Sequence, residues 1–300
     1  MTARIALATA AEFPDLDDDG PALLAALSSL GIAADAAVWT DARVDYSPYD
    51  LVVVRSCWDY HERLDEFLAW ADRVAATTTL ANAAQVLAWN THKTYLRELG
   101  AVGLPVVETT WLDPGDTFTV PASGEYVVKP AVSAGSRNTN RYVPGDHDDR
   151  ATRHVRSLLD AGLTVMVQPY LDAIDTAGET ALLYFGGEFS HAVRKAPLLE
   201  LGMPLVTAAF KPESMQPRAA SPAELAAAGR VLDALPSTAA AVARRDLLYA
   251  RVDLVPGADG SPTLLELELA EPSMFLTLDG ADGADSAARF AAAIAARVGG

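Results

Sequence analysis

Two neighbouring segments near the C-terminal end of the chain carry charged side chains on one face only. Residues 249–255 read Tyr-Ala-Arg-Val-Asp-Leu-Val, and residues 263–269 read Thr-Leu-Leu-Glu-Leu-Glu-Leu. The peptide between them, Pro-Gly-Ala-Asp-Gly-Ser-Pro, has the composition of a turn. Because side chains alternate between the two faces of a strand, each segment is predicted to place its charged residues together and its apolar residues on the opposite face.

An antiparallel hairpin built from these segments brings several carboxylates together. A simple register sets Asp253 opposite Glu266 and Arg251 opposite Glu268. Since like charges opposite each other destabilise a sheet, three carboxylates beside one Arg indicate a bound cation. Oxygen ligands of this kind suit Mg²⁺ or Mn²⁺, so we predict a metal site at Asp253, Glu266 and Glu268. A solvated hairpin face with an Arg–Glu pair is the alternative, which the purely apolar opposite face disfavours.

Length, charge and cysteine content restrict the class of protein. The 300 residues, 50% of them hydrophobic, predict two or three packed units. With a net charge of −17, no nucleic-acid partner is expected. No apolar run approaches the roughly 18 residues of a membrane-spanning helix. Cys57 is the only cysteine, which fits a reducing compartment. The short N-terminal apolar run is followed by acidic residues, unlike a signal peptide, so a cytoplasmic protein is expected.

The first part of the chain alternates predicted strands and helices, which indicates a parallel sheet. These elements are expected near residues 5–8, 22–30, 36–39, 51–54 and 62–75. Ligands collect at the carboxyl ends of parallel strands, where the peptide Arg-Ser-Cys-Trp-Asp-Tyr follows the third strand. We therefore predict that Trp58 and Tyr60 contact a substrate, with packing as the alternative. The absence of a Gly-x-Gly-x-x-Gly turn argues against a dinucleotide site.

The rest of the chain mixes strands and helices without repeats. Helices are expected near residues 91–99, 150–161 and 284–298 and from residue 221 onward, and strands near residues 106–111, 125–129, 164–170, 180–185 and 189–194. Ser221 and Glu224 form a predicted capping box at a helix start. Lys129 ends a predicted strand before a loop of small polar residues at 133–140, an arrangement that binds phosphate through loop N–H groups and the ammonium. A surface Lys lying along apolar neighbours is the alternative.

Taken in order, these segments resemble the ATP-grasp superfamily of carboxylate–amine ligases. The matching motifs are Asn-Thr-His-Lys at 90–93, Val-Val-Lys-Pro at 127–130, the loop at 133–140, Val-Gln-Pro-Tyr-Leu at 167–171, Gly-Glu at 178–179, Lys195, Arg-Val-Asp at 251–253 and Glu-x-Glu at 266–268. The resemblance covers about two-thirds of the chain. It implies an α/β fold, α+β in the C-terminal half: an N-terminal parallel-sheet domain at 1–88, a small central lid domain at 89–165 and a domain at 166–300 with a mostly antiparallel sheet.

The same resemblance implies a role for each matching residue. The ATP-binding residues would be Lys93, Lys129, Ser133, Gly135, Ser136, Gln168, Tyr170, Leu171, Glu179 and Lys195. Asp253, Glu266 and Glu268 would bind Mg²⁺ (or Mn²⁺), although family members commonly carry Asn at the position of Glu268. Arg251 and Lys195 would be catalytic, because they would hold the transferring phosphoryl group. ATP and Mg²⁺ are therefore the expected cofactors.

The resemblance also implies a reaction. Transfer of the ATP γ-phosphate to a substrate carboxylate gives an acyl phosphate, which a nitrogen then attacks, so the protein supplies positioning and charge neutralisation. Within the superfamily, Arg-Ser-x-Trp-Asp-Tyr, Gln-Pro-Tyr-Leu and the strand pair at 185–195 resemble the cyclo-ligases of antibiotic-producing bacteria that form cycloserine from O-ureido-serine. There a nitrogen of the same molecule closes the ring, and the ureido remainder is lost as carbon dioxide and ammonia.

This reading predicts a small amino-acid-like substrate and leaves a homo-oligomer open. The expected substrate residues are Arg55, Trp58, Asp59, Tyr60 and Ser273. Arg55 would suit a carboxylate and Asp59 an ammonium. One alternative is an intermolecular ligase of the same superfamily that joins an amino acid to a second amine. The other is a nucleotide-binding regulatory protein without catalysis.

Overall fold

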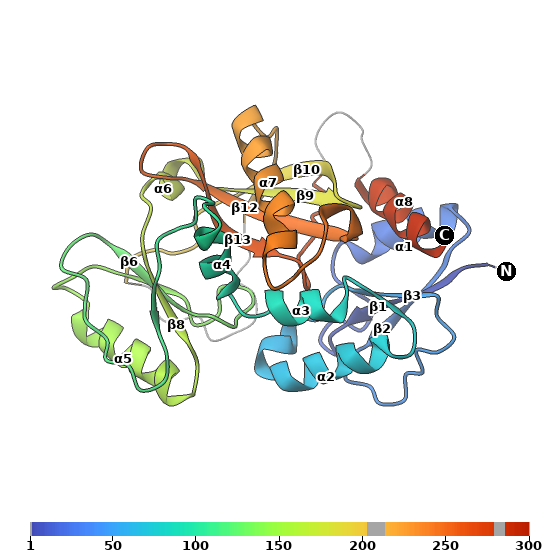
Figure 1. Ribbon diagram of the computed structural model, residues 1–300, viewed down its shortest axis with the longest axis horizontal. Coiled ribbons are helices and arrows are strands. Elements are labelled where there is room, and N and C mark those ends of the chain that lie inside the picture. The colour runs from blue at the N-terminus through green and yellow to red at the C-terminus, as the bar shows by residue number, and fades with distance from the viewer. Residues whose placement is uncertain (1, 203–213, 279–285, 300) are drawn as a thin grey trace.

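The structure is a computed structural model that describes residues 2–202, 214–278 and 286–299. It contains three sheets that follow one another along the long axis of the molecule (Figure 1). One sheet is parallel and the other two are antiparallel. The expected fold class, α/β with an α+β C-terminal half, is confirmed. No helix within the described ranges is both long and apolar enough to cross a membrane.

The N-terminal sheet has the strand order β2-β1-β3-β4. Its elements are β1 (Arg4–Thr9), α1 (Gly20–Ser29), β2 (Ala33–Val38), β3 (Leu51–Val54), η1 (Trp58–Glu62), α2 (Leu64–Ala75), β4 (Thr79–Ala81) and α3 (Ala84–Asn90). Ile5 and Leu7 share a cluster with residues of α1, whereas Ala6 and Ala8 share one with residues of α2. Helices therefore cover both faces, which explains the continuous apolar run of β3. The sequence interpretation missed β4 and α3.

The central sheet is antiparallel, with the order β5-β8-β6-β7. This part of the chain contains α4 (Tyr95–Ala101), β5 (Thr110–Leu112), β6 (Tyr126–Pro130), β7 (Asn140–Tyr142), α5 (Asp148–Asp160) and β8 (Val165–Pro169). Apolar residues of α5 pack against β6 and β8. The predicted helix at 91–99 is wrong at its start, since α4 begins at Tyr95. The predicted strand at 106–111 is confirmed only at its end, where β5 begins at Thr110, whereas Val106 forms an isolated bridge with Leu264.

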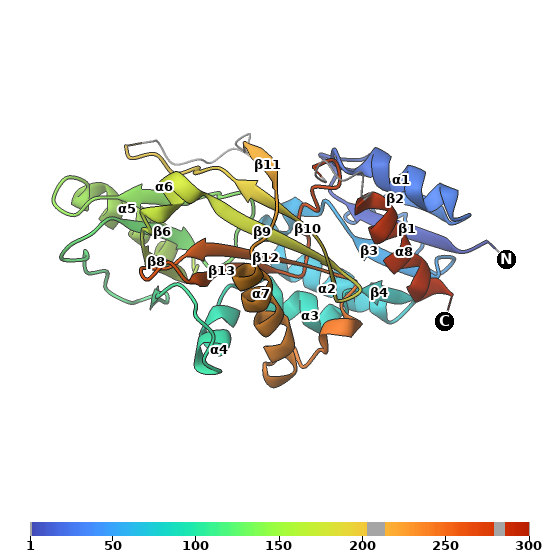
Figure 2. The same ribbon diagram turned by 90° about the horizontal axis from the view of Figure 1, so that it is seen from above.

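The C-terminal sheet has the order β11-β10-β9-β12-β13, and its long strands run across the middle of Figure 2. Its elements are α6 (Ala173–Ala177), β9 (Glu179–Phe185), β10 (Glu188–Lys195), β11 (Met215–Arg218), α7 (Pro222–Ala234), β12 (Tyr249–Pro256), β13 (Pro262–Glu268) and α8 (Ser286–Val298). The capping box at the start of α7 is confirmed, with reciprocal hydrogen bonds between Ser221 and Glu224. Of the predicted closing helix at 284–298, the first two residues lie outside the described ranges.

The hairpin of β12 and β13 has the predicted register. Arg251 pairs with Glu268 and Asp253 with Glu266, and a bulge follows Asp253. Apolar partners on the other face pack against α7, with Leu264 and Leu267 in the same buried cluster as residues of that helix. The apolar face is therefore fixed by core packing, which leaves the charged face turned toward the central sheet.

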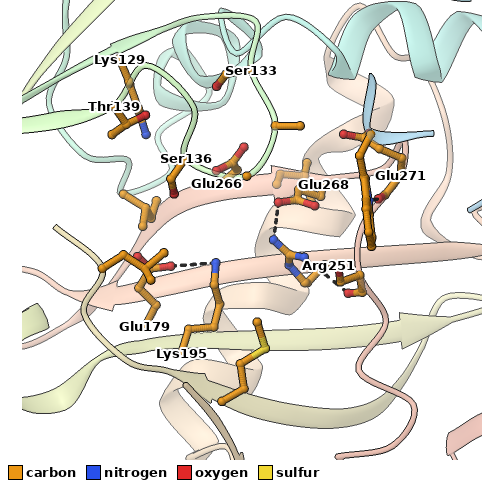
Figure 3. A pocket seen from close by; sticks show the side chains of 18 of the residues that line it. Lys129, Ser133, Ser136, Thr139, Glu179, Lys195, Arg251, Glu266, Glu268 and Glu271 are labelled. Carbon is orange, nitrogen blue, oxygen red and sulfur yellow. Dashed lines mark hydrogen bonds and ion pairs between the residues drawn. The ribbon is translucent and has the colours of Figure 1, made fainter. Parts of the chain in front are cut away.

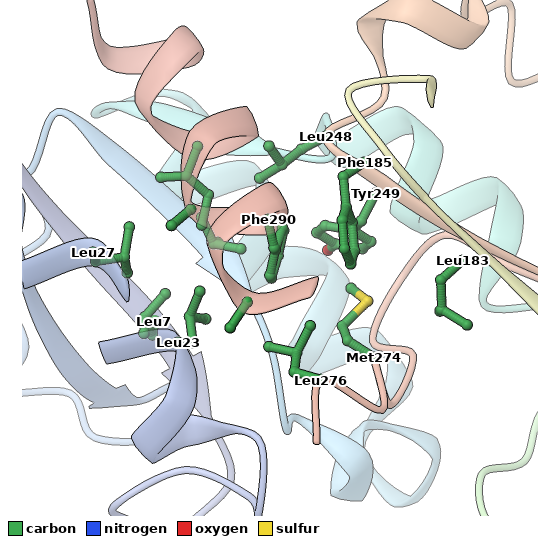
Figure 4. Packing of buried hydrophobic residues seen from close by; sticks show 14 of the residues in the cluster. Leu7, Leu23, Leu27, Leu183, Phe185, Leu248, Tyr249, Met274, Leu276 and Phe290 are labelled. Atoms are coloured by element: carbon green, nitrogen blue, oxygen red, sulfur yellow. The ribbon is translucent and has the colours of Figure 1, made fainter. Parts of the chain in front are cut away.

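A shared core joins the N-terminal sheet to the C-terminal sheet through α8. Phe290 of α8 is fully buried, and its ring stacks on Phe185 of β9 at 4.6 Å between centroids. Leu23 and Leu27 of α1 belong to the same cluster (Figure 4). Burying these large side chains stabilises the contact by roughly 1.5–3 kcal/mol for each. The two sheets are thus held in one arrangement, and the segments that follow β1 and β3 reach the same cavity as the C-terminal sheet.

Candidate active site

A cavity of about 750 Å³ is lined by residues of the central and C-terminal sheets, and by the segments that follow β1 and β3 of the N-terminal sheet. This volume lies within the range of small-molecule and cofactor sites. Most of the predicted site residues line the cavity: Trp58, Tyr60, Lys93, Lys129, Ser133, Gly135, Ser136, Gln168, Tyr170, Leu171, Glu179, Lys195, Arg251, Glu266, Glu268 and Ser273. Residues far apart in the sequence therefore converge in one place.

Lys93, Lys129 and Lys195 give the cavity positive charge. Figure 3 shows Lys129 and Lys195 on the same side of Glu268 and Arg251. The ammonium of Lys93 lies 3.1 Å from Glu266 Oε1 and donates a hydrogen bond to the Ser133 carbonyl at 3.0 Å. Lys195 Nζ lies 3.0 Å from Glu179 Oε2 and 3.2 Å from Asp253 Oδ2. Burial lowers the pKa of Lys129, which has no ion-pair partner among the described residues. An anion such as a phosphate would supply the missing partner.

Arg251 is the centre of the acidic side of the cavity. Its Nε and Nη2 each lie 2.9 Å from one oxygen of Asp253, and Nη2 also pairs with Glu268. Burial would raise the pKa of Asp253, but Arg251 and Lys195 outweigh it and hold the pKa below its usual range. Burial raises the pKa of Glu268 to about 7 despite the nearby Arg251. Asp253 is therefore ionised and holds Arg251 and Lys195 in place. The positive charge near Glu268 is too small to offset the effect of burial on its pKa.

The predicted metal ligands fit a divalent ion unequally. Glu266 and Glu268 line the cavity, and their carboxylates are oxygen ligands that suit Mg²⁺. Asp253 does not line it, and both its oxygens are taken by Arg251 and Lys195. Across the described ranges, no three His, Cys, Asp or Glu side chains already form a metal-binding group. Glu266 and Glu268 thus fit the ion, and Asp253 would join them only after losing a cationic partner.

Two predicted substrate residues lie outside the cavity lining. Arg55 is 2% exposed, pairs with Asp17 and Asp19 at 3.6 and 3.8 Å, and donates to the Pro272 carbonyl at 3.4 Å. Asp59 accepts a hydrogen bond from the Trp39 indole at 2.7 Å. The structure gives both side chains intramolecular partners, and their contact with a substrate stays a prediction.

The sequence interpretation missed four carboxyl groups that line the cavity, those of Asp17, Asp18, Asp19 and Glu271. Asp17 belongs to the acidic stretch that was used only to exclude a signal peptide, and its Oδ1 is buried without a hydrogen-bond partner. Glu271 follows β13 and is 8% exposed. Glu271 could have been found from the sequence, because it lies near Ser273 in a stretch where members of the superfamily often contact their substrates.

Stability of the ligand-free protein is expected to fall as pH rises from about 4.5 to about 8. Burial raises the pKa of Glu271 to about 8 and that of Glu268 to about 7 from a usual 4.5. The folded state therefore binds more protons than the unfolded state in this pH window. The stabilisation that this proton binding gives is fully present below pH 4.5, and it is lost as pH rises through the pKa values of the two carboxyl groups in the folded state. Thermal unfolding of Glu271→Gln should show a higher Tm than wild type at pH 8 and an equal one at pH 4.5. An identical pH dependence in both proteins would contradict the assigned pKa.

A parallel-sheet domain followed by two antiparallel sheets that enclose lysines and carboxylates defines an ATP-grasp protein. Comparison with solved structures agrees: D-alanine–D-alanine ligase from Bacillus anthracis complexed with ATP shares the fold, with a TM-score of 0.67 at 11% identity over 99% of this chain and 97% of that chain. The ATP-grasp ligase PsnB complexed with minimal precursor matches with a TM-score of 0.63 at 19% identity, over 99% and 100% of the two chains.

Closer relatives identify the family. A family model described as the N-terminal domain of D-cycloserine synthetase DcsG matches residues 5–82. The chain is 39% identical over 304 residues to the cycloserine biosynthesis protein DcsG of Streptomyces lavendulae, covering 98% of each. The crystal structure of D-cycloserine synthetase DcsG matches with a TM-score of 0.87 at 38% identity, over 99% of this chain and 100% of that chain. The chain belongs to the DcsG family of ATP-grasp ligases.

Proposed function

We propose that the chain is an ATP-dependent cyclo-ligase that forms cycloserine by closing a ring within O-ureido-serine. One observation carries the proposal: three lysines and the Arg251 carboxylate cluster converge on a single cavity in a chain that is 39% identical to DcsG from end to end. Phosphoryl transfer needs charge neutralisation and alignment, which this set of side chains supplies.

The position of each residue in the cavity indicates its role in phosphoryl transfer. Lys129 and the loop residues Ser133 and Ser136 would bind the nucleotide phosphates, since they line the lysine end of the cavity. Lys195 is held by Glu179 and would neutralise the transferring phosphoryl group. Arg251 would hold the substrate carboxylate that receives the phosphate. A divalent ion on Glu266 and Glu268 would add Lewis-acid charge at the phosphates when bound.

Ring closure then needs only one substrate. The acyl phosphate carbon is attacked by the nitrogen attached to the side-chain oxygen, the C–N bond forms, and phosphate leaves with the electron pair of the C–O bond. An intramolecular nucleophile has a high effective concentration, so no second amine pocket is required. The ring nitrogen loses its proton, and water then cleaves its bond to the carbamoyl carbon. The carbamate that is released breaks down to carbon dioxide and ammonia, which leaves cycloserine.

ADP formation with a single amino acid tests this function directly. The purified protein is incubated with ATP, Mg²⁺ and O-ureido-serine, and ADP and product mass are measured. We expect ADP in equal amount to a product with the mass of cycloserine, with no other amine present. ADP that forms only after a second amino acid or amine is added would contradict ring closure and favour an intermolecular ligase.

A further inference from the structure

The segment that follows β13 has no regular secondary structure, yet side chains from distant elements hold its backbone at nearly every residue. Asn90 and Asn82 bind the Leu269 N–H and carbonyl at 2.6 and 2.8 Å. The Tyr249 hydroxyl donates to the Ala270 carbonyl at 2.8 Å, and the Trp58 indole donates to the Glu271 carbonyl at 2.9 Å. Such a web of contacts fixes residues 269–276, which we name the anchored segment.

The next residues of the anchored segment are held in the same manner. Arg55 donates to the Pro272 carbonyl and Arg251 to the Ser273 carbonyl, each at 3.4 Å. Asp19 accepts hydrogen bonds from the N–H groups of residues 274 and 276 at 3.2 and 2.7 Å. Arg55 and Asp19 are both buried. Arg55 also pairs with Asp17 and lies over the Phe290 ring, so its guanidinium is held in place while it binds the backbone of the anchored segment.

The side chain that this framework presents to the cavity is Glu271. It lines the cavity and is 8% exposed, and its carboxyl makes no hydrogen bond or ion pair within the described part of the chain. In Figure 3 it lies on the far side of Glu268 and Arg251 from Lys129 and Ser136. Glu271 therefore occupies the end of the cavity opposite the phosphate-binding end, where a substrate would lie.

The charges around Glu271 indicate what it binds. Burial raises its pKa, and the like charge of Glu268 adds to the effect, while Lys93 acts against it. A buried carboxylate without a partner is unfavourable by several kcal/mol on general grounds, so a cation at this position would relieve the cost. Within the described part of the chain, the other basic groups of the cavity do not pair with Glu271: Lys93 pairs with Glu266, Lys195 with Glu179 and Asp253, and Arg251 with Asp253 and Glu268. The missing positive charge must therefore come from a ligand.

We propose that Glu271 binds the α-ammonium group of the amino-acid substrate, and that Arg55 and Trp58 position Glu271 through the anchored segment. The proposal rests on the proposed function, because it assumes that the carboxylate to be phosphorylated lies beside Arg251. It makes the site specific for α-amino acids over simple carboxylic acids. It also gives Arg55 a positioning role in place of direct contact with the substrate.

A comparison of two substrates in two proteins tests the proposal. The substrates are O-ureido-serine and its des-amino analogue, 3-(ureidooxy)propanoate, and ADP formation gives kcat/KM for each. In the wild type, loss of the amino group should lower kcat/KM by about 100-fold or more, as for one partner of a buried ion pair. In Glu271→Gln, kcat/KM for O-ureido-serine should fall by a similar factor. The variant should then differ by less than about 3-fold in kcat/KM between the two substrates, because the substitution and the loss of the amino group remove the same contact.

Another carboxyl group of the cavity provides the matched control. Asp18 also lines the cavity and, unlike Asp17 and Asp19, does not pair with Arg55, so Asp18→Asn removes a charge from the same space and leaves the Arg55 contacts in place. We expect Asp18→Asn to keep the full preference of about 100-fold for the amino substrate. If Glu271→Gln keeps that preference, or if Asp18→Asn abolishes it, Glu271 does not bind the ammonium. A wild type that forms no ADP with O-ureido-serine would instead refute the proposed function.

Discussion

Glu266→Gln is expected to lower kcat for ADP formation by about 1000-fold or more while the fold stays intact, since electrostatic stabilisation of a phosphoryl transfer is worth several kcal/mol. Glu266 lines the cavity, pairs with Lys93 at 3.1 Å, and is one of the two carboxylates that fit a divalent ion. Nearby Lys93 and Lys129 hold the pKa of Glu266 below its usual range against the effect of burial. The side chain is thus ionised, and Gln has the same shape without the charge.

The measurement is ADP release across a range of Mg²⁺ concentrations, with circular dichroism and thermal unfolding to check the fold. Glu188→Gln, at the exposed start of β10, is the matched control and should leave activity unchanged. Near-normal activity of Glu266→Gln at limiting Mg²⁺ would remove Glu266 from the proposed metal site.

Arg251→Lys should lower kcat as much as Glu266→Gln does, and it should also lower the free energy of unfolding. The Arg251 guanidinium contacts both oxygens of Asp253 and pairs with Glu268, a planar arrangement that a lysine cannot reproduce. We expect kcat to fall by about 1000-fold. We expect the free energy of unfolding to fall by about 2 kcal/mol, because Asp253 is 1% exposed and would keep only Lys195 as a partner.

Urea denaturation and ADP release would measure both effects. Arg245→Lys is the control, since the Arg245 side chain is 86% exposed, and it should match the wild type in both assays. An Arg251→Lys enzyme with wild-type kcat would show that the guanidinium is not needed to hold the carboxylate that receives the phosphate. An unchanged free energy of unfolding would show that the ion pair with Lys195 alone is enough to stabilise the buried carboxylate of Asp253.

The hairpin and the lysines could be predicted from the sequence because their signals are local and periodic. Alternation in residues 249–255 and 263–269 gave both the strands and the register of Arg251 with Glu268, since a slip by one residue would bury the charges. The positions of Lys129 and Lys195 at strand ends followed from the same reasoning. Collinear motifs then placed these parts in one superfamily, and the comparisons confirmed it.

What the sequence did not provide depends on tertiary contacts. Arg55 follows a buried strand at the sheet edge where ligands gather, so a substrate role was a fair inference from position alone. The structure shows that its guanidinium is 2% exposed and bonded to Asp17, Asp19 and the anchored segment. Short elements were missed for a similar reason: β4 has three residues, and its pairing with β3 fixes it more than its own propensity does.

Isotope transfer gives the most direct test of the central claim that ATP phosphorylates the substrate carboxylate. O-ureido-serine labelled with ¹⁸O in both carboxylate oxygens is converted by the enzyme with unlabelled ATP and Mg²⁺, and the inorganic phosphate is analysed by mass spectrometry. An acyl phosphate intermediate predicts one ¹⁸O atom in each phosphate released, together with ADP. Phosphate without ¹⁸O, or AMP as the nucleotide product, would contradict the account.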